Sequence, residues 1–251
     1  MPTDAIVLAA GAGERLGGAV PKAFALLAGE PLVVRAVRAV AAGGVDRIVV
    51  VVSPDRVAEV ADLLGALEGL SLSIVAGGTS RVESTRLGLA SLRGDPADVV
   101  IVHDAARPLA RRATFRAAIE AVLAGADGAS PTLPALDTIA FVTGDRITEV
   151  PTRSRLVRVQ TPQAFRRDVL MSAHEAAAAA GDVSATDDGG LVLRYLPDAR
   201  IVPVAGDERN LKITTPLDLE LATRLLAQFE DEVEVSGEVV GRSSRRSSSG
   251  T

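Results

Sequence analysis

Two basic residues and two glycines near the start of the chain have the types and spacing that suit phosphate binding. Gly11 and Gly13 follow the apolar run of residues 5–10, and Arg15 and Lys22 lie on the same predicted loop. Glycine lets the backbone approach a ligand and turn its N–H groups towards phosphate oxygens. The two side chains add fixed positive charge. The stretch therefore predicts a site for an anionic ligand such as a nucleoside triphosphate.

Two common phosphate-binding motifs do not fit this stretch. A dinucleotide-binding fingerprint requires a third glycine, and Leu16 stands in its place. A P-loop ends in Gly-Lys-Ser/Thr, whereas Lys22 follows Pro21 and precedes Ala23. Glycines alone are also consistent with a tight turn between a strand and a helix. The charges of Arg15 and Lys22 favour a ligand-binding loop of another type.

Three further loops carry groups suited to the same chemistry. Residues 77–81 combine glycine backbone with small hydroxyls, and Lys212 lies on a late loop. Asp104 is able to bind Mg²⁺ or orient a substrate hydroxyl, or else to cap a helix or pair with Arg107. Basic loops with a carboxylate suit phosphoryl or nucleotidyl transfer, which depends on positioning and charge neutralisation. We expect His103 to pack behind this site rather than act as a base.

Apolar runs alternate with amphipathic segments along most of the chain, which predicts strands followed by helices. Ser53 with Pro54, and Thr215 with Asp218, look like helix starts. The predicted strands are residues 5–10, 47–52, 72–75, 98–102, a strand starting within 127–131, and 200–204. The predicted helices are residues 31–42, 54–67, 82–92, 111–123, 166–180, a short helix ending at 196, and a last helix starting at 215.

This alternation predicts an α/β fold, with a mostly parallel, Rossmann-like sheet covered by helices on both faces. Ligands of such sheets bind beyond the carboxyl ends of the strands. The loops at 11–22, 77–81 and 104–107 all follow predicted strands. We therefore expect them to line one crevice.

The alternation of predicted strands and helices is interrupted at about residues 135–153. Residues 137–142 and 146–150 read as a β-hairpin about a Gly-Asp turn. A projecting hairpin needs a surface to pack on, so it either contacts a second subunit or folds back on its own domain. Residues 1–230 are expected to form a single domain. Residues 231–251, first acidic and then rich in Ser and Arg, are expected to be disordered.

The composition excludes several classes of protein. The chain of 251 residues has a net charge of −5 and no cysteine, which disfavours nucleic-acid binding and excludes disulfides and cysteine nucleophiles. No apolar run reaches the length of a membrane span, and no signal peptide precedes the first strand. We expect a cytoplasmic protein.

Five short motifs, in order over about residues 4–228, carry a resemblance to a known family. They lie at residues 9–22, 102–108 (Val-His-Asp-Ala-Ala-Arg-Pro), 161–163 (Thr-Pro-Gln), 186–187 (Thr-Asp) and 210–216 (Asn-Leu-Lys-Ile-Thr-Thr-Pro). The sequence resembles the 2-C-methyl-D-erythritol 4-phosphate cytidylyltransferases of non-mevalonate isoprenoid synthesis. The first motif is shared by many sugar-phosphate nucleotidyltransferases, whereas the second and the last are more specific.

The resemblance implies that CTP binds with Mg²⁺ and that a phosphate oxygen of methylerythritol phosphate displaces pyrophosphate from its α-phosphorus. It implies that Arg15 and Lys22 are catalytic and that Asp104 lies near the metal. It also implies a homodimer whose arm lends residues to the partner's site. The implied nucleotide-binding positions are Ala9, Ala10, Gly11, Ala12, Gly13, Gly78, Thr79, Ser84, Asp104 and Ala105. The implied positions for the second substrate are Asp104, Arg107, Thr138, Arg153, Thr161, Thr186 and Lys212, of which Thr138, Arg153 and Thr161 would cross over.

Two positions depart from the family pattern, and other functions stay open. Ala23 replaces a glutamine that often follows Pro-Lys, and Thr79 replaces an acidic residue. Ribitol 5-phosphate is an alternative acceptor for the same chemistry. A nucleotide-dependent oxidoreductase is disfavoured by the missing third glycine, and a silent nucleotide-binding module by the presence of both Arg15 and Lys22.

Overall fold

The computed structural model describes residues 2–11, 21–67, 69–92 and 98–228. Ala12, Gly13 and Arg15 of the first loop, and the predicted tail, lie outside the described residues. Among the described residues, no helix is long and apolar enough to cross a membrane.

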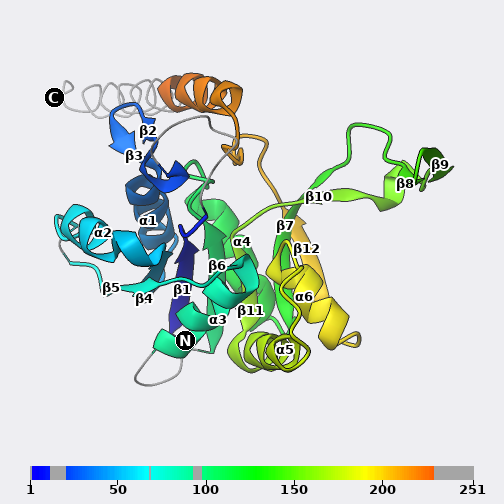
Figure 1. Ribbon diagram of the computed structural model, residues 1–251, viewed down its shortest axis with the longest axis horizontal. Coiled ribbons are helices and arrows are strands. Elements are labelled where there is room, and N and C mark those ends of the chain that lie inside the picture. Colours follow the sequence, from blue (N-terminus) through cyan, green and yellow to red (C-terminus); the bar gives the residue numbers. More distant parts are fainter. Residues whose placement is uncertain (1, 12–20, 68, 93–97, 229–251) are drawn as a thin grey trace, which may run out of the picture.

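One eight-stranded sheet forms the centre of the molecule, in the order β10-β7-β11-β6-β1-β4-β5, with β12 paired to β7 (Figure 1). The pairs that join β4 to β5, β1 to β4 and β6, and β7 to β12 are parallel. Among the described strands of this sheet, only β10 and β11 run antiparallel to their neighbours. The strands are β1 (Thr3–Leu8), β4 (Arg47–Val52), β5 (Leu72–Ala76), β6 (Val99–Asp104), β7 (Gly128–Pro134), β10 (Val157–Val159), β11 (Gln163–Arg166) and β12 (Ile201–Ala205). The predicted mostly parallel sheet is confirmed.

Helices cover both faces of this sheet. Alternate residues of β4 divide between two cores, as the twofold repeat of a strand requires: Val50 packs with α1 and α4, and Val51 packs with α3 and α5. The helices are α1 (Leu32–Ala42), α2 (Val57–Leu64), α3 (Arg81–Ser91), α4 (Arg112–Leu123), α5 (Arg167–Ala179), α6 (Asp188–Tyr195) and a last helix over residues 216–228. Short 3₁₀ turns lie at η2 (Lys22–Phe24), η3 (Pro54–Arg56) and η4 (Arg153–Arg155), and a small ladder joins β2 (Leu26–Leu27) to β3 (Glu30–Pro31).

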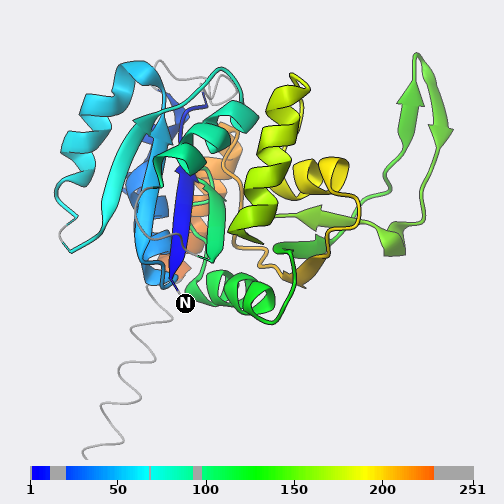
Figure 2. The ribbon, with the colours of Figure 1, turned by 90° about the horizontal axis from the view of Figure 1, so that it is seen from below.

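The predicted hairpin forms an arm that projects away from the sheet (Figures 1 and 2). Within the part of the chain that the structure describes, its strands, β8 (Phe141–Thr143) and β9 (Arg146–Glu149), pair only with each other. Gly144 has a φ of +62°, which a glycine accommodates at this tight turn. The arm and the strands that lead to it expose several large apolar side chains, namely Leu136, Ile139, Phe141, Val142, Ile147, Val150 and Val157.

Most predicted elements match the structure, with several differences, among them β10 and the β2–β3 ladder, which were not predicted. Ser53 makes no side-chain cap, and its helix starts with the η3 turn. The first hairpin strand begins at Phe141 rather than 137. Gln163 was expected as part of a motif and Arg166 as the start of a helix, yet residues 163–166 form β11, which inserts antiparallel between β6 and β7. Four residues show too little periodicity to predict such a strand.

Candidate active site

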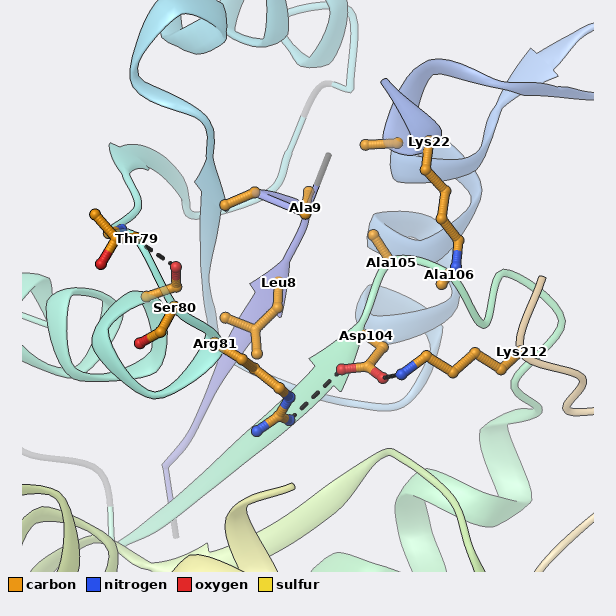
Figure 3. Close-up of a pocket in the computed structure, with 15 residues that line it drawn as sticks. Leu8, Ala9, Lys22, Thr79, Ser80, Arg81, Asp104, Ala105, Ala106 and Lys212 are labelled. Atoms are coloured by element: carbon orange, nitrogen blue, oxygen red, sulfur yellow. Dashed lines mark hydrogen bonds and ion pairs between the residues drawn. The ribbon is translucent and has the colours of Figure 1, made fainter. Parts of the chain in front are cut away.

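A pocket of about 400 Å³ opens beyond the carboxyl ends of β1 and β6, where the fold class predicts a ligand (Figure 3). Its lining comes from four loops and the first turn of α3. The described lining residues are Leu8, Ala9, Ala10, Gly11, Lys22, Ala23, Gly78, Thr79, Ser80, Arg81, Ser84, Asp104, Ala105, Ala106 and Lys212. The loops that the sequence separates therefore meet at one crevice, as predicted.

The register between β1 and β6 brings the loops that follow these two strands together. Leu8 pairs with Asp104, and the Ala105 N–H donates a 3.0 Å hydrogen bond to the Leu8 carbonyl. The loop after β5 also packs closely against the loop after β1. A Cβ added at Gly77 would lie 2.8 Å from the Ala10 side chain. Only glycine at this position allows the loop after β5 to approach the loop after β1 so closely.

The second glycine loop is braced by its own side chains before it opens α3. The Ser80 hydroxyl accepts a hydrogen bond from the Glu83 N–H at 3.0 Å, which is an N-cap. The Glu83 carboxylate accepts hydrogen bonds from the Thr79 N–H and hydroxyl at 2.7 and 2.9 Å, and these bonds lower its pKa. The Gly78 N–H donates to the Ser84 hydroxyl at 3.2 Å. The loop is therefore held in place by its own hydrogen bonds.

Asp104 lies between two cations that approach it from opposite sides (Figure 3). Lys212 Nζ is 2.7 Å from Oδ2, and an Arg81 guanidinium nitrogen is 3.5 Å from Oδ1. Burial alone would raise the pKa of Asp104, but the charges of Arg81 and Lys212 outweigh it and hold the pKa well below its usual range. The Asp104 carboxylate is therefore ionised at neutral pH.

His103 is packed behind the pocket, which confirms the prediction. Its Nε2 lies 3.1 Å from the Arg107 carbonyl, which can only accept, so Nε2 carries the proton. Its Nδ1 then accepts the Thr161 hydroxyl proton at 3.2 Å, and that hydroxyl oxygen accepts the Asp104 N–H at 3.1 Å. Burial lowers the pKa of His103 to about 4, so the ring is neutral and holds the backbone of Asp104 in place.

Arg107 and Thr161 do not line the pocket but support its rim. The Arg107 guanidinium donates a 2.8 Å hydrogen bond to the Asn210 carbonyl. The Asn210 side-chain amide donates to the Thr161 carbonyl, also at 2.8 Å. The Gln160 side-chain amide donates to the Asp207 carbonyl, in the loop that contains Asn210. These contacts fix the loop that carries Lys212.

The structure brings together most of the predicted site residues. Those that line the pocket are Ala9, Ala10, Gly11, Lys22, Gly78, Thr79, Ser84, Asp104, Ala105 and Lys212. Thr186 is exposed just before α6, and Thr138 and Arg153 lie on the arm, so none of these three lines the pocket of the same chain. The Arg153 guanidinium donates to the Leu136 carbonyl at 3.2 Å, within the base of the arm.

Arg81 lines the pocket but was not predicted as a site residue from the sequence. It is the first residue of α3, where a cation opposes the positive end of the helix dipole. A basic residue at such an unfavourable position, directly after a glycine loop, is a signal that would have identified it.

Comparisons with known proteins agree with this geometry. The profile of the family described as "2-C-methyl-D-erythritol 4-phosphate cytidylyltransferase" matches residues 3–228. The enzyme of that name from Streptomyces avermitilis is 45% identical, over 90% of this chain and 92% of its own. The one from Saccharopolyspora erythraea is 46% identical, over 90% of this chain and all of its own.

Solved structures with related names have the same fold. The 4-diphosphocytidyl-2C-methyl-D-erythritol synthase of Anaerococcus prevotii superposes with a TM-score of 0.77 at 27% identity, over 90% of this chain and 98% of its own. The 2-C-methyl-D-erythritol 4-phosphate cytidylyltransferase of Thermus thermophilus gives 0.69 at 29% identity, over 88% and 98%. The chain therefore belongs to the 2-C-methyl-D-erythritol 4-phosphate cytidylyltransferase family and is a nucleotidyltransferase.

Proposed function

We propose that the protein transfers the cytidylyl group of CTP to 2-C-methyl-D-erythritol 4-phosphate, in isoprenoid precursor synthesis by the non-mevalonate route. A phosphate oxygen of the acceptor attacks the α-phosphorus of CTP and forms a new P–O bond. The bond from that phosphorus to the oxygen bridging to the β-phosphate breaks, so pyrophosphate leaves and 4-diphosphocytidyl-2-C-methyl-D-erythritol remains. The observation that carries the proposal is the meeting of the glycine loops, Lys22, Asp104 and Lys212 at one pocket.

The nucleotide occupies the part of the pocket formed by the first two loops. Ala9–Gly11 and Gly78 offer backbone with small or no side chains, so phosphates can approach closely. The volume of about 400 Å³ falls in the range of small-molecule sites, which is roughly 300–1,000 Å³. The N–H and the hydroxyl of Thr79 both donate to the Glu83 carboxylate. Thr79 therefore contributes shape to this surface rather than a free donor.

Charge neutralisation is the main catalytic requirement of this reaction. Negative charge builds on the phosphoryl oxygens and the leaving pyrophosphate, and fixed cations stabilise it in the transition state. We assign this role to Lys22, which lines the pocket, and to Arg15, which lies outside the described residues. Neither the attacking phosphate oxygen nor the leaving pyrophosphate requires a strong base or acid, which agrees with the neutral, buried His103.

A divalent cation, Mg²⁺, fits the donor set of the pocket. The described residues contain no cluster of three or more His, Cys, Asp or Glu side chains suited to a metal. Asp104 is the one carboxylate among the described lining residues. Mg²⁺ is commonly bound through one or two carboxylates together with substrate phosphates, so Asp104 would hold it next to the triphosphate. When bound, the metal supplies further neutralisation of phosphate charge.

The acceptor would bind on the side of the pocket near Asp104, Arg107 and Lys212, with Thr186 at its edge, while Thr161 supports Asp104 from behind. Thr138 and Arg153 lie on the projecting arm, so they complete this site if the arm reaches a second copy of the chain. The exposed apolar side chains of the arm support such a homodimer, because an isolated two-stranded hairpin is marginally stable in water. We also place the protein in the cytoplasm, as its lack of cysteine suggests.

The test is pyrophosphate release from CTP and Mg²⁺, with 2-C-methyl-D-erythritol 4-phosphate and ribitol 5-phosphate supplied in parallel. We expect rapid release with the first acceptor alone, and loss of release when EDTA removes the metal. Release with ribitol 5-phosphate alone would overturn the proposed acceptor but keep the reaction. Absence of release with both, in a protein that binds CTP, would overturn cytidylyl transfer to either polyol phosphate.

A further inference from the structure

A line of alternating charges runs from the pocket into the interior behind Asp104. One guanidinium nitrogen of Arg81 lies 2.7 Å from Asp188 Oδ2 and 3.5 Å from Asp104 Oδ1. The other oxygen of Asp188 lies 3.0 Å from His174 Nε2. Asp188 and His174 are each only 1% exposed and do not line the pocket. Nothing in the proposed chemistry uses them.

The two carboxylates compete for one arginine, and Asp188 holds it more closely. Arg81 begins α3 and Asp188 begins α6, so the pair joins two helix starts that lie far apart in the sequence. The longer contact leaves Asp104 Oδ1 less firmly paired than Oδ2, which Lys212 approaches to 2.7 Å. Oδ1 is therefore the oxygen that a ligand can most readily share.

The start of α6 is itself fixed from the sheet. Gln163, on β11, is fully buried, and its side-chain carbonyl accepts the N–H groups of Asp188 and Gly189 at 3.1 and 3.2 Å. Its amide donates to the Asp187 carboxylate at 2.8 Å. Asp188 is thus anchored through its backbone as well as its side chain, so it can hold Arg81 in one place.

We infer that Arg81 is a positioning residue for cytidylyl transfer, and that Asp188 acts through it by keeping its guanidinium from closing onto Asp104. This inference rests on the proposed function. Without the charge of Asp188, the partly buried guanidinium would pair fully with Asp104 and occupy the oxygen that a ligand needs. Loss of the Asp188 charge should therefore lower turnover, although Asp188 does not line the pocket.

The experiment is a double-mutant cycle with Asp188→Asn and Arg81→Gln, in pyrophosphate release with CTP, Mg²⁺ and 2-C-methyl-D-erythritol 4-phosphate. Misplaced catalytic groups cost about 10- to 100-fold in rate, so we expect Asp188→Asn to lower kcat by that factor. The Kd for CTP, from calorimetry without Mg²⁺ or acceptor, should change by less than about threefold, since the glycine loops are untouched. In the Arg81→Gln background, Asp188→Asn should cost less than about threefold more.

A merely structural role for Asp188 gives a different pattern. The two losses would then multiply, and this result would overturn the inference. Wild-type kcat in a folded Asp188→Asn protein would overturn it as well. An inactive wild-type protein in the same assay would instead contradict the proposed function, and the inference with it.

Asp4→Asn is a matched control at the opposite end of β1. Asp4 is also a buried carboxylate shared by two arginines, with Arg47 at 2.7 Å and Arg167 at 3.4 Å. It should lower the melting temperature but leave kcat unchanged. If Asp188→Asn does not fold, Arg81→Lys replaces it, because an ammonium keeps the charge but loses the planar fork. We expect Arg81→Lys to lower kcat about 10-fold, and wild-type turnover by this variant would contradict the inference.

Discussion

The pocket concentrates positive charge in a protein that is acidic overall. Its described lining contains Lys22, Arg81 and Lys212 against the single carboxylate of Asp104, whereas the whole chain has a net charge of −5. Lys22 and Lys212 are also the only two lysines of the chain, since all other basic residues are arginines. A lysine ammonium is a compact point charge without the planar fork of arginine. Two of the three described cations of the pocket are therefore of a kind that occurs nowhere else in the chain.

Replacing Lys22 with Ala tests the catalytic assignment. Loss of one electrostatic donor to a developing charge costs about 10²–10³ in kcat, so we expect a loss of this order. The residue begins the short η2 turn and is not part of the core, so thermal unfolding should change little. Lys22→Arg should restore only part of the activity, because its fork distributes the charge differently. Normal turnover in Lys22→Ala would rule out the assignment.

The scarcity of lysine also permits a direct view of the site in solution. Reductive methylation with ¹³C-formaldehyde would label only Lys22, Lys212 and the terminal amine. We expect both lysine signals to shift when CTP and Mg²⁺ are added, because both ammonium groups line the pocket. A Lys212→Arg variant assigns the two signals. If neither moved at saturating CTP, the nucleotide would bind elsewhere.

Segment 160–163, which leads into β11, joins the loops around the pocket. Gln160 holds the loop of Asn210, Thr161 holds the backbone of Asp104, and Gln163 holds the start of α6. Three loops from distant parts of the sequence are thus tied to one short segment. The antiparallel insertion of β11 beside β6 is what places these side chains behind the pocket.

The last helix, residues 216–228, has a capping arrangement that makes its stability depend on pH. The Asp218 carboxylate accepts hydrogen bonds from the N–H groups of Thr214 and Thr215, both at 2.8 Å. Burial alone would raise the pKa of Asp218, but these hydrogen bonds outweigh it and lower the pKa. Its stabilisation is therefore complete above the unfolded value of about 3.9 and is lost as the pH falls through the lower folded value.

We expect Asp218→Asn to lower the melting temperature at pH 7 and to differ much less from wild type at pH 2–3. Thermal unfolding followed by circular dichroism at a series of pH values provides the measurement. Asp55→Asn is a control, since Asp55 is an exposed acidic residue in the short η3 turn. A constant difference between Asp218→Asn and wild type at every pH would show that ionisation of Asp218 does not contribute.

The molecule as a whole consists of a compact sheet with helices and an arm that carries apolar residues into solvent (Figure 2). Thr138 and Arg153 belong to this arm, away from the pocket of their own chain. Association of two chains would cover the apolar residues and could bring the arm residues to a partner's pocket. Stability of the arm and completion of the second-substrate site would then depend on the same contact.

Ile147, which is 70% exposed on β9, tests this association. We expect Ile147→Glu to shift a dimer towards monomer in light scattering, because the substitution places a charge in an apolar interface. Turnover should fall with the dimer fraction. Leu217→Glu is the matched control, since Leu217 is 72% exposed on the last helix rather than on the arm. A wild-type protein that is monomeric at working concentrations would remove the shared-site proposal.

Local patterns in the sequence were enough to predict the sheet, most helices and the loops of the pocket. Residues 47–52, β-branched at five of six positions, form β4 with the predicted bounds, and Thr215 with Asp218 begins the last helix as expected. Strand identity and capping depend on neighbours within a few residues, so the sequence displays them directly. The glycine loops could be predicted for the same reason, because each directly follows a strand in the sequence.

Contacts between distant segments required the folded chain. Nothing near Arg81 in the sequence indicates that Asp104 and Asp188 share it, and nothing near Gln163 indicates that it anchors α6. Arg107, a predicted substrate-binding residue, also has a partner that the sequence does not indicate, since its guanidinium donates to the Asn210 carbonyl. Such pairings depend on which elements the sheet order places side by side, and the antiparallel insertion of β11 sets much of that order. Local periodicity does not indicate the order of strands in the sheet. That order brings together residues that the chain separates by 20 to 100 positions or more.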